Sequence, residues 1–370
     1  MKGYRKIFIF VISILFLINP VYAVVDKNWL DSKVKAFVKN KPVKAMIYGL
    51  WIDGTPVSIN AVGESMTGVP ATVNMHYRIG GITETMLTAA LMLLVEENRI
   101  RLDDKISRWY PDLPNADLVT VKMLANCTSG YPDYVYNRKF IDEVINNPFR
   151  SWTDKDLIDY ATMEKPKFKP GTSQHYSHTD FVILGSILSQ VSHLSTNELL
   201  NNYIFKRVGM NNTQFNLNAM MPHPVLHAFS QDRGIYEEST YWNPSWTSNS
   251  GAVVSNITDI GKWAHAWMRK GLLTEKSIQI LRAPDTVGKG KNTNDFYFAM
   301  GFVNVNHWLI QNPSFGGYSG VFGVLPEKNM VFIAVNTLNE SRPDDTNYSV
   351  ELLRDLAMDL APDYPIPVSR

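Results

Sequence analysis

The pattern of hydrophobic and polar positions predicts helices near both ends of the chain and a β-hairpin after the first of them. Apolar residues recur at helical spacing in Asp26–Val38 and again in Asn347–Leu360. Ala45–Ile52 has the pattern of a strand, Asp53-Gly54 is a strong hairpin turn, and Thr55–Val62 returns as the partner strand. The sequence therefore predicts a helix and a hairpin at the start and a helix at the end.

The last third of the chain predicts further strands. They are short, apolar and separated by Gly, Pro or Glu-Lys-Asn turns, and they cover Phe298–Val305, Trp308–Gln311, Val321–Leu325 and Met330–Asn336. Because the connections are short, we expect these strands to be antiparallel. The fold class is therefore predicted to be α+β, a mixed α/β arrangement with an antiparallel sheet.

One further helix carries few polar residues on any face. It follows Gly80-Gly81 and continues to about Glu97, which is the pattern of a helix buried on every side. From about residue 102 to residue 250 the pattern becomes helical and rich in loops, with frequent prolines. We expect the apolar helix to be the central pillar of a single large domain.

Composition and charge exclude several classes of protein. The chain has 370 residues, of which 45% are hydrophobic, so it can bury a large core. Its formal charge is +1, from 36 basic and 35 acidic residues, which gives no electrostatic reason to expect nucleic acid as a partner. Cys127 is the only cysteine and cannot form an internal disulfide.

Residues 1–23 have the pattern of a secretory signal peptide. Lys2, Arg5 and Lys6 form a basic region, Ile7–Ile18 an apolar region, and Val21-Tyr22-Ala23 a cleavage site of small-residue type. The alternative is a retained membrane anchor, but the apolar run is short for a membrane span. We expect cleavage near Ala23, no stable membrane anchor afterwards, and export to the periplasm or the medium.

Several strings carry a resemblance to a known family. The first is YRIGGITETMLTAALMLLVEENRIRLDDKI, and it is followed by VTVKMLANCTSGYPDY, IFKRVGMNNTQF and SNSGAVVSNITDIGKWAHAW. In order and spacing they resemble the class C serine β-lactamases, the DD-peptidases among the penicillin-binding proteins, and related esterases. The resemblance implies that the terminal helices pack on one face of the sheet. It also implies a sheet lobe of about residues 24–80 and 251–370, with a helical lobe of about residues 81–250 between them.

At its first motif the chain departs from this family. The family pattern is F-R-I-G-S-x-T-K, in which a nucleophilic serine opens the helix and a lysine lies one turn later. Gly81 and Glu84 stand at those two positions. Glycine offers no attacking oxygen, and a carboxylate cannot supply a positive charge. The backbone geometry at the start of the helix is the simplest reason for the glycine, and a polar pocket is the expected surrounding of Glu84.

The second and third motifs supply the remaining candidate residues. The family's Tyr-x-Asn resembles Tyr176-Ser177-His178, and its Lys/His-x-Gly resembles Ser314-Phe315-Gly316. The resemblance makes Glu84, Tyr176 and His178 the candidates for chemistry. The candidate ligand contacts are Gly81, Ser177, Ser314, Gly316, Gly317 and Tyr318. An aromatic rim for ligand stacking or a protein interface is expected from Tyr131, Tyr134, Tyr136, Tyr241, Trp242, Trp246 and Tyr318.

The changes at residues 84 and 178 look mutually compensating. In the family a lysine meets the amide oxygen of the asparagine, whereas here a carboxylate at residue 84 is matched by an imidazole that can donate a hydrogen bond. We therefore predict that Glu84 and His178 form a hydrogen-bonded pair across the cleft. They make at most two metal ligands, fewer than a catalytic zinc site needs, so neither a metal nor another cofactor is expected.

Three functions follow from these observations. The leading one is an exported pseudoenzyme that has lost serine acyl-enzyme catalysis and binds a small peptide or D-amino-acid-containing ligand, such as a peptidoglycan peptide. The alternative is a hydrolase with a changed mechanism that uses Glu84, Tyr176 and His178 as acid and base groups. The third is a non-catalytic partner of an envelope protein complex.

Overall fold

A large antiparallel sheet organises the chain. The computed structural model describes residues 25–269, 271–341 and 346–368. Within these ranges nine strands form one sheet of order β3-β2-β1-β14-β13-β11-β10-β9, with β12 paired to β13. The strands are β1 (Val43–Ile52), β2 (Thr55–Met66), β3 (Val69–Pro70), β9 (Phe296–Phe298), β10 (Val303–Val305), β11 (Trp308–Gln311), β12 (Ser314–Phe315), β13 (Tyr318–Leu325) and β14 (Met330–Leu338). The predicted hairpin and the antiparallel pairing are confirmed.

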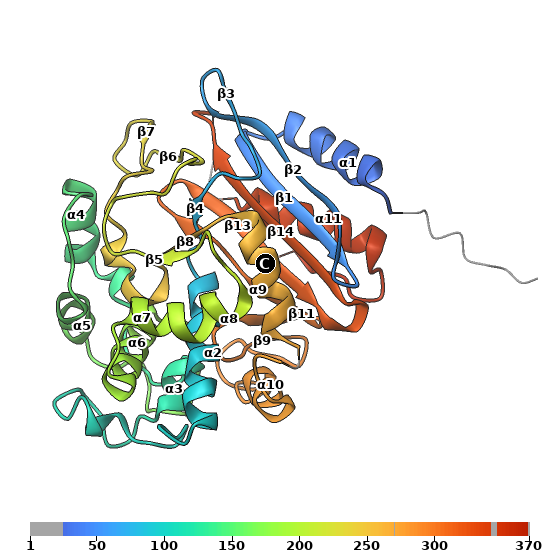
Figure 1. The fold of residues 1–370 in the computed structure, drawn as a ribbon. Helices are drawn as coiled ribbons and strands as arrows, with labels where there is room; N and C mark the ends of the chain where they lie inside the picture. The colour runs from blue at the N-terminus through green and yellow to red at the C-terminus, as the bar shows by residue number, and fades with distance from the viewer. Residues whose placement is uncertain (1–24, 270, 342–345, 369–370) are drawn as a thin grey trace, which may run out of the picture.

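The terminal helices pack on the same face of this sheet, as expected. Helix α1 (Lys27–Lys39) begins at an N-cap, Asp26, whose side chain accepts a hydrogen bond from the Trp29 amide. Helix α11 (Tyr348–Leu360) begins after a similar cap, Asn347. Their apolar residues join the sheet's residues in one buried cluster, and Figure 1 shows both helices along that side of the sheet. The signal peptide predicted for residues 1–23 lies outside the described residues.

Helix α2 (Ile82–Glu96) is the predicted central pillar. Every residue from Ile82 to Leu94 is buried. Helix α9 (Ile257–Trp267) packs between α2 and the sheet, and its Trp263 Nε1 donates a hydrogen bond of 2.9 Å to Thr85 Oγ1 on α2. The first turn of α2 is therefore connected to the sheet through α9.

The remaining elements form the helical part of the molecule and its connections. Figure 1 shows α4 to α7 gathered on the side of α2 away from the large sheet. The helices are α3 (Val121–Ala125), α4 (Arg138–Asn146), α5 (Asp154–Thr162), α6 (His178–Ser192), α7 (Thr196–Leu200), α8 (Lys206–Val208) and α10 (Glu275–Arg282). The short strands are β4 (Tyr77–Arg78), β5 (Gln214–Phe215), β6 (Phe229–Ser230), β7 (Glu237–Glu238) and β8 (Val253–Ser255).

One predicted strand is wrong. The run Phe298–Val305 is divided between β9 and β10, which form a hairpin in which Phe298 pairs with Val303. The turn depends on Gly301, whose φ of +85° is in the left-handed region. A Cβ there would lie 2.9 Å from the Glu84 carbonyl oxygen, so the turn packs on α2. Because a buried turn carries apolar residues, its sequence resembles a strand.

No helix among the described residues is long and apolar enough to cross a membrane.

Candidate functional site

The two glycines before α2 have different structural roles. Gly80 has a φ of +47°, and a Cβ on it would lie 2.8 Å from the Ser314 amide nitrogen. Gly81 has φ −59° and ψ −13°, a right-handed helical conformation that any residue adopts. The expectation that backbone geometry explains Gly81 is therefore wrong. Gly80, not Gly81, has the left-handed conformation that favours glycine.

The position of the neighbouring Gln311 side chain explains the glycine at residue 81 instead. A Cβ built on Gly81 would lie 2.6 Å from Gln311 Oε1, 3.0 Å from Gln311 Cδ and 3.1 Å from Gln311 Nε2. Gln311 ends β11, is 8% exposed, and donates from Nε2 to the Gly301 carbonyl oxygen at 3.1 Å. Its Oε1 accepts a hydrogen bond of 2.9 Å from the Asn312 amide. The amide of Gln311 is thus held in the space that a side chain at residue 81 needs.

Glu84 lies in a polar pocket inside the protein, as the sequence predicted. Its side chain is fully buried and accepts hydrogen bonds from the Tyr176 hydroxyl at Oε1 and from Gln311 Nε2 at Oε2, the latter at 2.8 Å. Burial raises the pKa of Glu84 well above 4.5, and the nearby Asp133 carboxylate raises it further, against the opposing effect of the two hydrogen bonds. Burial also raises the pKa of Tyr176, and the negative charge of Glu84 adds to it. This pocket therefore favours a neutral carboxyl group at residue 84.

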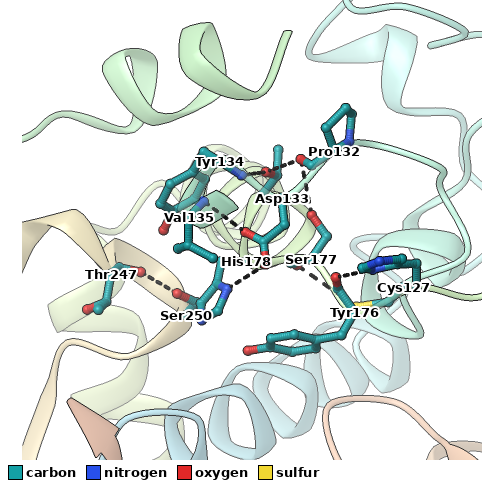
Figure 2. A network of polar contacts seen from close by, with 12 residues as sticks. Cys127, Pro132, Asp133, Tyr134, Val135, Tyr176, Ser177, His178, Thr247 and Ser250 are labelled. Carbon is teal, nitrogen blue, oxygen red and sulfur yellow. Dashed lines mark hydrogen bonds and ion pairs between the residues drawn. The ribbon is translucent and has the colours of Figure 1, made fainter. Parts of the chain in front are cut away.

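His178 does not pair with Glu84, so the predicted pair is wrong. His178 Nδ1 lies 2.9 Å from Asp133 Oδ2, the bond drawn in Figure 2, while Glu84 pairs with Tyr176 and Gln311. The Tyr176 ring packs edge-on against the imidazole, with 4.9 Å between ring centroids. The physical reason is that Asp133, a fully buried carboxylate, offers the imidazole a closer acceptor.

Asp133 also fixes the orientation of the His178 ring. Its Oδ1 accepts a hydrogen bond of 3.3 Å from the Val135 amide, which holds the carboxylate at the start of a short 3₁₀ turn, Tyr134–Tyr136. With Nδ1 donating to this carboxylate, Nε2 is left for another partner. The His178 side chain is 25% exposed, and no hydrogen bond to Nε2 is formed within the described part of the chain.

The other candidate contacts are not all available to a ligand. Ser177 is buried and its hydroxyl donates to the Pro132 carbonyl oxygen at 3.3 Å. Tyr318 is 2% exposed and donates to the Leu226 carbonyl oxygen. Ser314 is exposed, and Gly316 and Gly317 form the tight turn after it, with φ of +35° and +92°. Ser314 and this turn therefore remain accessible, whereas the hydroxyls of Ser177 and Tyr318 are engaged inside the protein.

The predicted aromatic rim is largely wrong. The side chains that are instead buried are Tyr131, Tyr134, Trp242 and Tyr318. Tyr136 is 69% exposed, Tyr241 is at the surface, and Trp246 is partly buried and stacks on Phe315 with 5.4 Å between ring centroids. Core packing explains the difference, because aromatic residues supply the apolar area that fills a large interior.

The described residues contain no group of three or more His, Cys, Asp or Glu side chains placed to hold a metal ion.

Comparison with known proteins identifies the family. The family model described as Beta-lactamase matches residues 30–354, which is most of the chain. The chain belongs to the β-lactamase family. The antiparallel sheet flanked by helices and the start of α2 agree with the fold that the sequence motifs implied.

Curated and solved relatives of this β-lactamase-family chain are distant in sequence. Penicillin-binding protein 4* of Bacillus subtilis (strain 168) is 22% identical over 319 residues, which are 77% of this chain and 65% of that protein, so the chain spans about two thirds of its length. The structure of the D-stereospecific amidohydrolase from Streptomyces sp. is similar with a TM-score of 0.79 at 21% identity, over 91% of this chain and 99% of that one.

A second solved relative is the D-amino acid amidase from Ochrobactrum anthropi SV3 in complex with D-phenylalanine. Its TM-score is 0.76 at 20% identity, over 90% of this chain and 99% of that one. At these identities the likeness of the structures shows the shared fold.

Sequence reasoning missed two residues of this site. Asp133 lies inside the matched string SGYPDY, and Gln311 lies three positions before Ser314. An acidic residue near a histidine in a matched motif was a usable signal for Asp133. The sequence carried no signal for Gln311, because its contacts with Gly81 and Glu84 join segments about 230 residues apart.

Proposed function

We propose that this chain is a β-lactamase-family protein that lacks serine acyl-enzyme chemistry and binds a small peptide or D-amino-acid-containing ligand non-covalently after export from the cytoplasm. The observation that carries the proposal is the position of Gln311. Its amide lies 2.6 Å from the place of a Cβ at residue 81, the position that the family pattern gives to the nucleophile. A side chain at residue 81 therefore requires this amide to move from its hydrogen-bonded position.

The surroundings of Glu84 support the same proposal. An acyl-enzyme mechanism needs a base or a cation beside the nucleophile to take up its proton. Glu84 is buried, both of its oxygens are engaged by Tyr176 and Gln311, and burial raises its pKa, which favours the neutral carboxyl group; it supplies no positive charge in either state. Glu84, Tyr176 and Gln311 are hydrogen-bonded to one another inside the site. A ligand is therefore expected to bind at the surface of the site.

His178 and the turn after Ser314 are the groups left for a ligand. Asp133 orients the imidazole so that Nε2 can accept a hydrogen bond from a ligand N–H or, when protonated, donate to a carboxylate. Two relatives of the same fold are a D-stereospecific amidohydrolase and a D-amino acid amidase. They support a ligand with a D-amino-acid unit.

The Asp133–His178 pair favours one alternative function. A carboxylate that orients an imidazole is the arrangement in which histidine acts as a general base. In this alternative, His178 removes a proton from a bound water, and the water oxygen attacks the ligand carbonyl beside Tyr176. The amide C–N bond then breaks, and His178 returns the proton to the leaving amine. The reaction is then a direct hydrolysis with no covalent intermediate.

Calorimetric titration with an acetylated D-Ala-D-Ala dipeptide and its L,L-isomer tests the proposal. We expect saturable binding that favours the D,D-isomer and is weakened at least tenfold in His178→Ala. Exposed His307, which pairs with Glu327 elsewhere, provides the control His307→Ala. Equal binding of both isomers, or none, would contradict the proposal. Chromatography of the titrated dipeptide distinguishes the alternative, which predicts free D-alanine.

A further inference from the structure

A cavity lies on the face of the large sheet that α11 covers, at the end that carries β10 and β11. It has a volume of about 620 Å³ and is bounded by β10, β11, α11 and the last described residues of the chain. Its wall is mainly apolar and includes Val303, Val305, Ile310, Val350 and Ile366. We call this cavity the edge groove.

Exposed apolar side chains continue from the edge groove to the surface. Phe296 on the edge strand β9 is 46% exposed and Val368 is 69% exposed, and both line the groove. Apolar side chains clustered around a concavity mark binding sites more often than scattered ones do. A volume of this size lies within the range of small-molecule sites, which is about 300–1,000 Å³.

The charged residues of the groove are both cationic. Arg354 on α11 and Lys291 line it, and none of the described residues in its lining is Asp or Glu. A guanidinium group is a planar donor whose geometry matches that of a carboxylate.

We propose that the edge groove binds a fatty-acid anion, which has one hydrocarbon chain and one carboxylate group. Its carboxylate accepts hydrogen bonds from Arg354 and a charge contact from Lys291, and its hydrocarbon chain lies along Val303, Val305 and Ile310. The charge of the lining selects an anion, and the apolar wall selects a hydrocarbon chain over a polar one. This inference does not depend on the proposed function of the cleft.

The experiment is a calorimetric titration of the protein with hexanoate, octanoate and decanoate, each below its micelle concentration. Burial of one methylene is worth about a fourfold gain in affinity, so the dissociation constants should fall by about that factor per methylene until the groove is filled. Methyl decanoate, which lacks the charge, should bind at least tenfold more weakly than decanoate.

Three variants locate the site. Arg354→Met keeps an apolar stem and should weaken decanoate at least tenfold while leaving methyl decanoate unchanged. Phe296→Ser, at an exposed position, should weaken both ligands. Lys276→Met, on the exposed part of α10, is the control and should bind decanoate as the unmodified protein does.

A dissociation constant that does not change with chain length would overturn the proposal, as would equal loss in Arg354→Met and Lys276→Met. Should Arg354→Met fail to fold, Phe296→Ser and the methyl ester still decide the matter. Unchanged decanoate binding in Phe296→Ser, or equal binding of ester and carboxylate, also contradicts it.

Discussion

Gln311 Oε1 lies 2.6 Å from the position that a Cβ on Gly81 would take. A real Cβ does not approach an oxygen atom so closely, so one of the two side chains has to move. This relationship joins β11 to the start of α2, and it accounts for the glycine at a backbone position that does not require one.

The first prediction concerns that contact. Gly81→Ala should lower the free energy of unfolding by about 1–3 kcal/mol, the usual cost of overpacking. In a Gln311→Ala background, Gly81→Ala should lower the free energy of unfolding by less, because the amide that the new Cβ would contact is absent. Urea unfolding of the unmodified protein, the two single variants and the double variant should give a coupling free energy of about 0.5–3 kcal/mol.

Gly251 offers the control for this cycle. A Cβ there would meet Thr247 and Gly80 rather than Gln311. Gly251→Ala and Gln311→Ala should therefore be additive within about 0.5 kcal/mol. Additivity in the Gly81 cycle as well would show that Gln311 does not fill the space beside residue 81.

The second prediction concerns the charge of Glu84. Its folded pKa lies above 4.5, the ordinary value for a glutamate, so between these two values the folded protein binds more protons than the unfolded chain. Stability should therefore fall as the pH rises through this window, by up to about 1.4 kcal/mol per pH unit for one proton. Glu84→Gln removes this contribution.

Urea unfolding between pH 4.5 and pH 8 provides the measurement. The buried Asp180 also has a raised pKa, but it is present in both proteins and cancels in the difference. The stability of the unmodified protein minus that of Glu84→Gln should decrease with pH. Parallel curves would mean that Glu84 is ionised throughout and that its pocket accommodates the charge.

The third prediction concerns Asp133 and His178. Because the two side chains are in direct contact, Asp133→Asn and His178→Gln should couple by about 0.5–3 kcal/mol in a thermal-unfolding cycle. Glu96, at the far end of α2, binds Thr274 and Ser277 and shares no partner with His178. A Glu96→Gln and His178→Gln cycle should be additive. If the Asp133 cycle were also additive, the pair would not exist in solution.

Sequence patterns gave the elements of this fold because each element is determined locally. The cap at Asp26, the Asp53-Gly54 turn and the apolar run of α2 all lie within the segments that they form. Patterns failed where distant segments meet. The turn at Gly301 packs against Glu84, so it carries apolar residues whose pattern predicts a strand.

The sequence predicted that Glu84, Tyr176 and His178 lie near one another, but it did not predict their contacts. Alignment with a family motif indicates which residues are near one another, and it brought Glu84 and Tyr176 together correctly. It does not decide which donor meets which acceptor. Asp133 is a closer acceptor for His178, and Gln311 on β11 supplies the second donor to Glu84.

The fourth prediction is a restoration of catalysis. Gly81→Ser, Glu84→Lys and His178→Asn together rebuild the first two motifs of the family, but Gln311 still fills the space of the new serine. Slow acylation by a fluorescent penicillin should therefore need Gln311→Ala as a fourth change. Gly81→Ser alone should show no acylation, because catalytic groups that act as a unit are strongly non-additive. Equal labelling of the single and fourfold variants would contradict this account.

The most direct test of the central proposal is intact-mass spectrometry of the purified protein after incubation with benzylpenicillin and, separately, with a fluorophosphonate. Gly81 has no oxygen to acylate, and Ser177 is buried with its hydroxyl engaged by Pro132. We predict that the mass of the protein stays unchanged with both reagents, while the fourfold variant gains a penicilloyl adduct. A stoichiometric adduct on any serine of the unmodified protein, with Ser314 and Ser319 the accessible ones beside the site, would contradict the proposal.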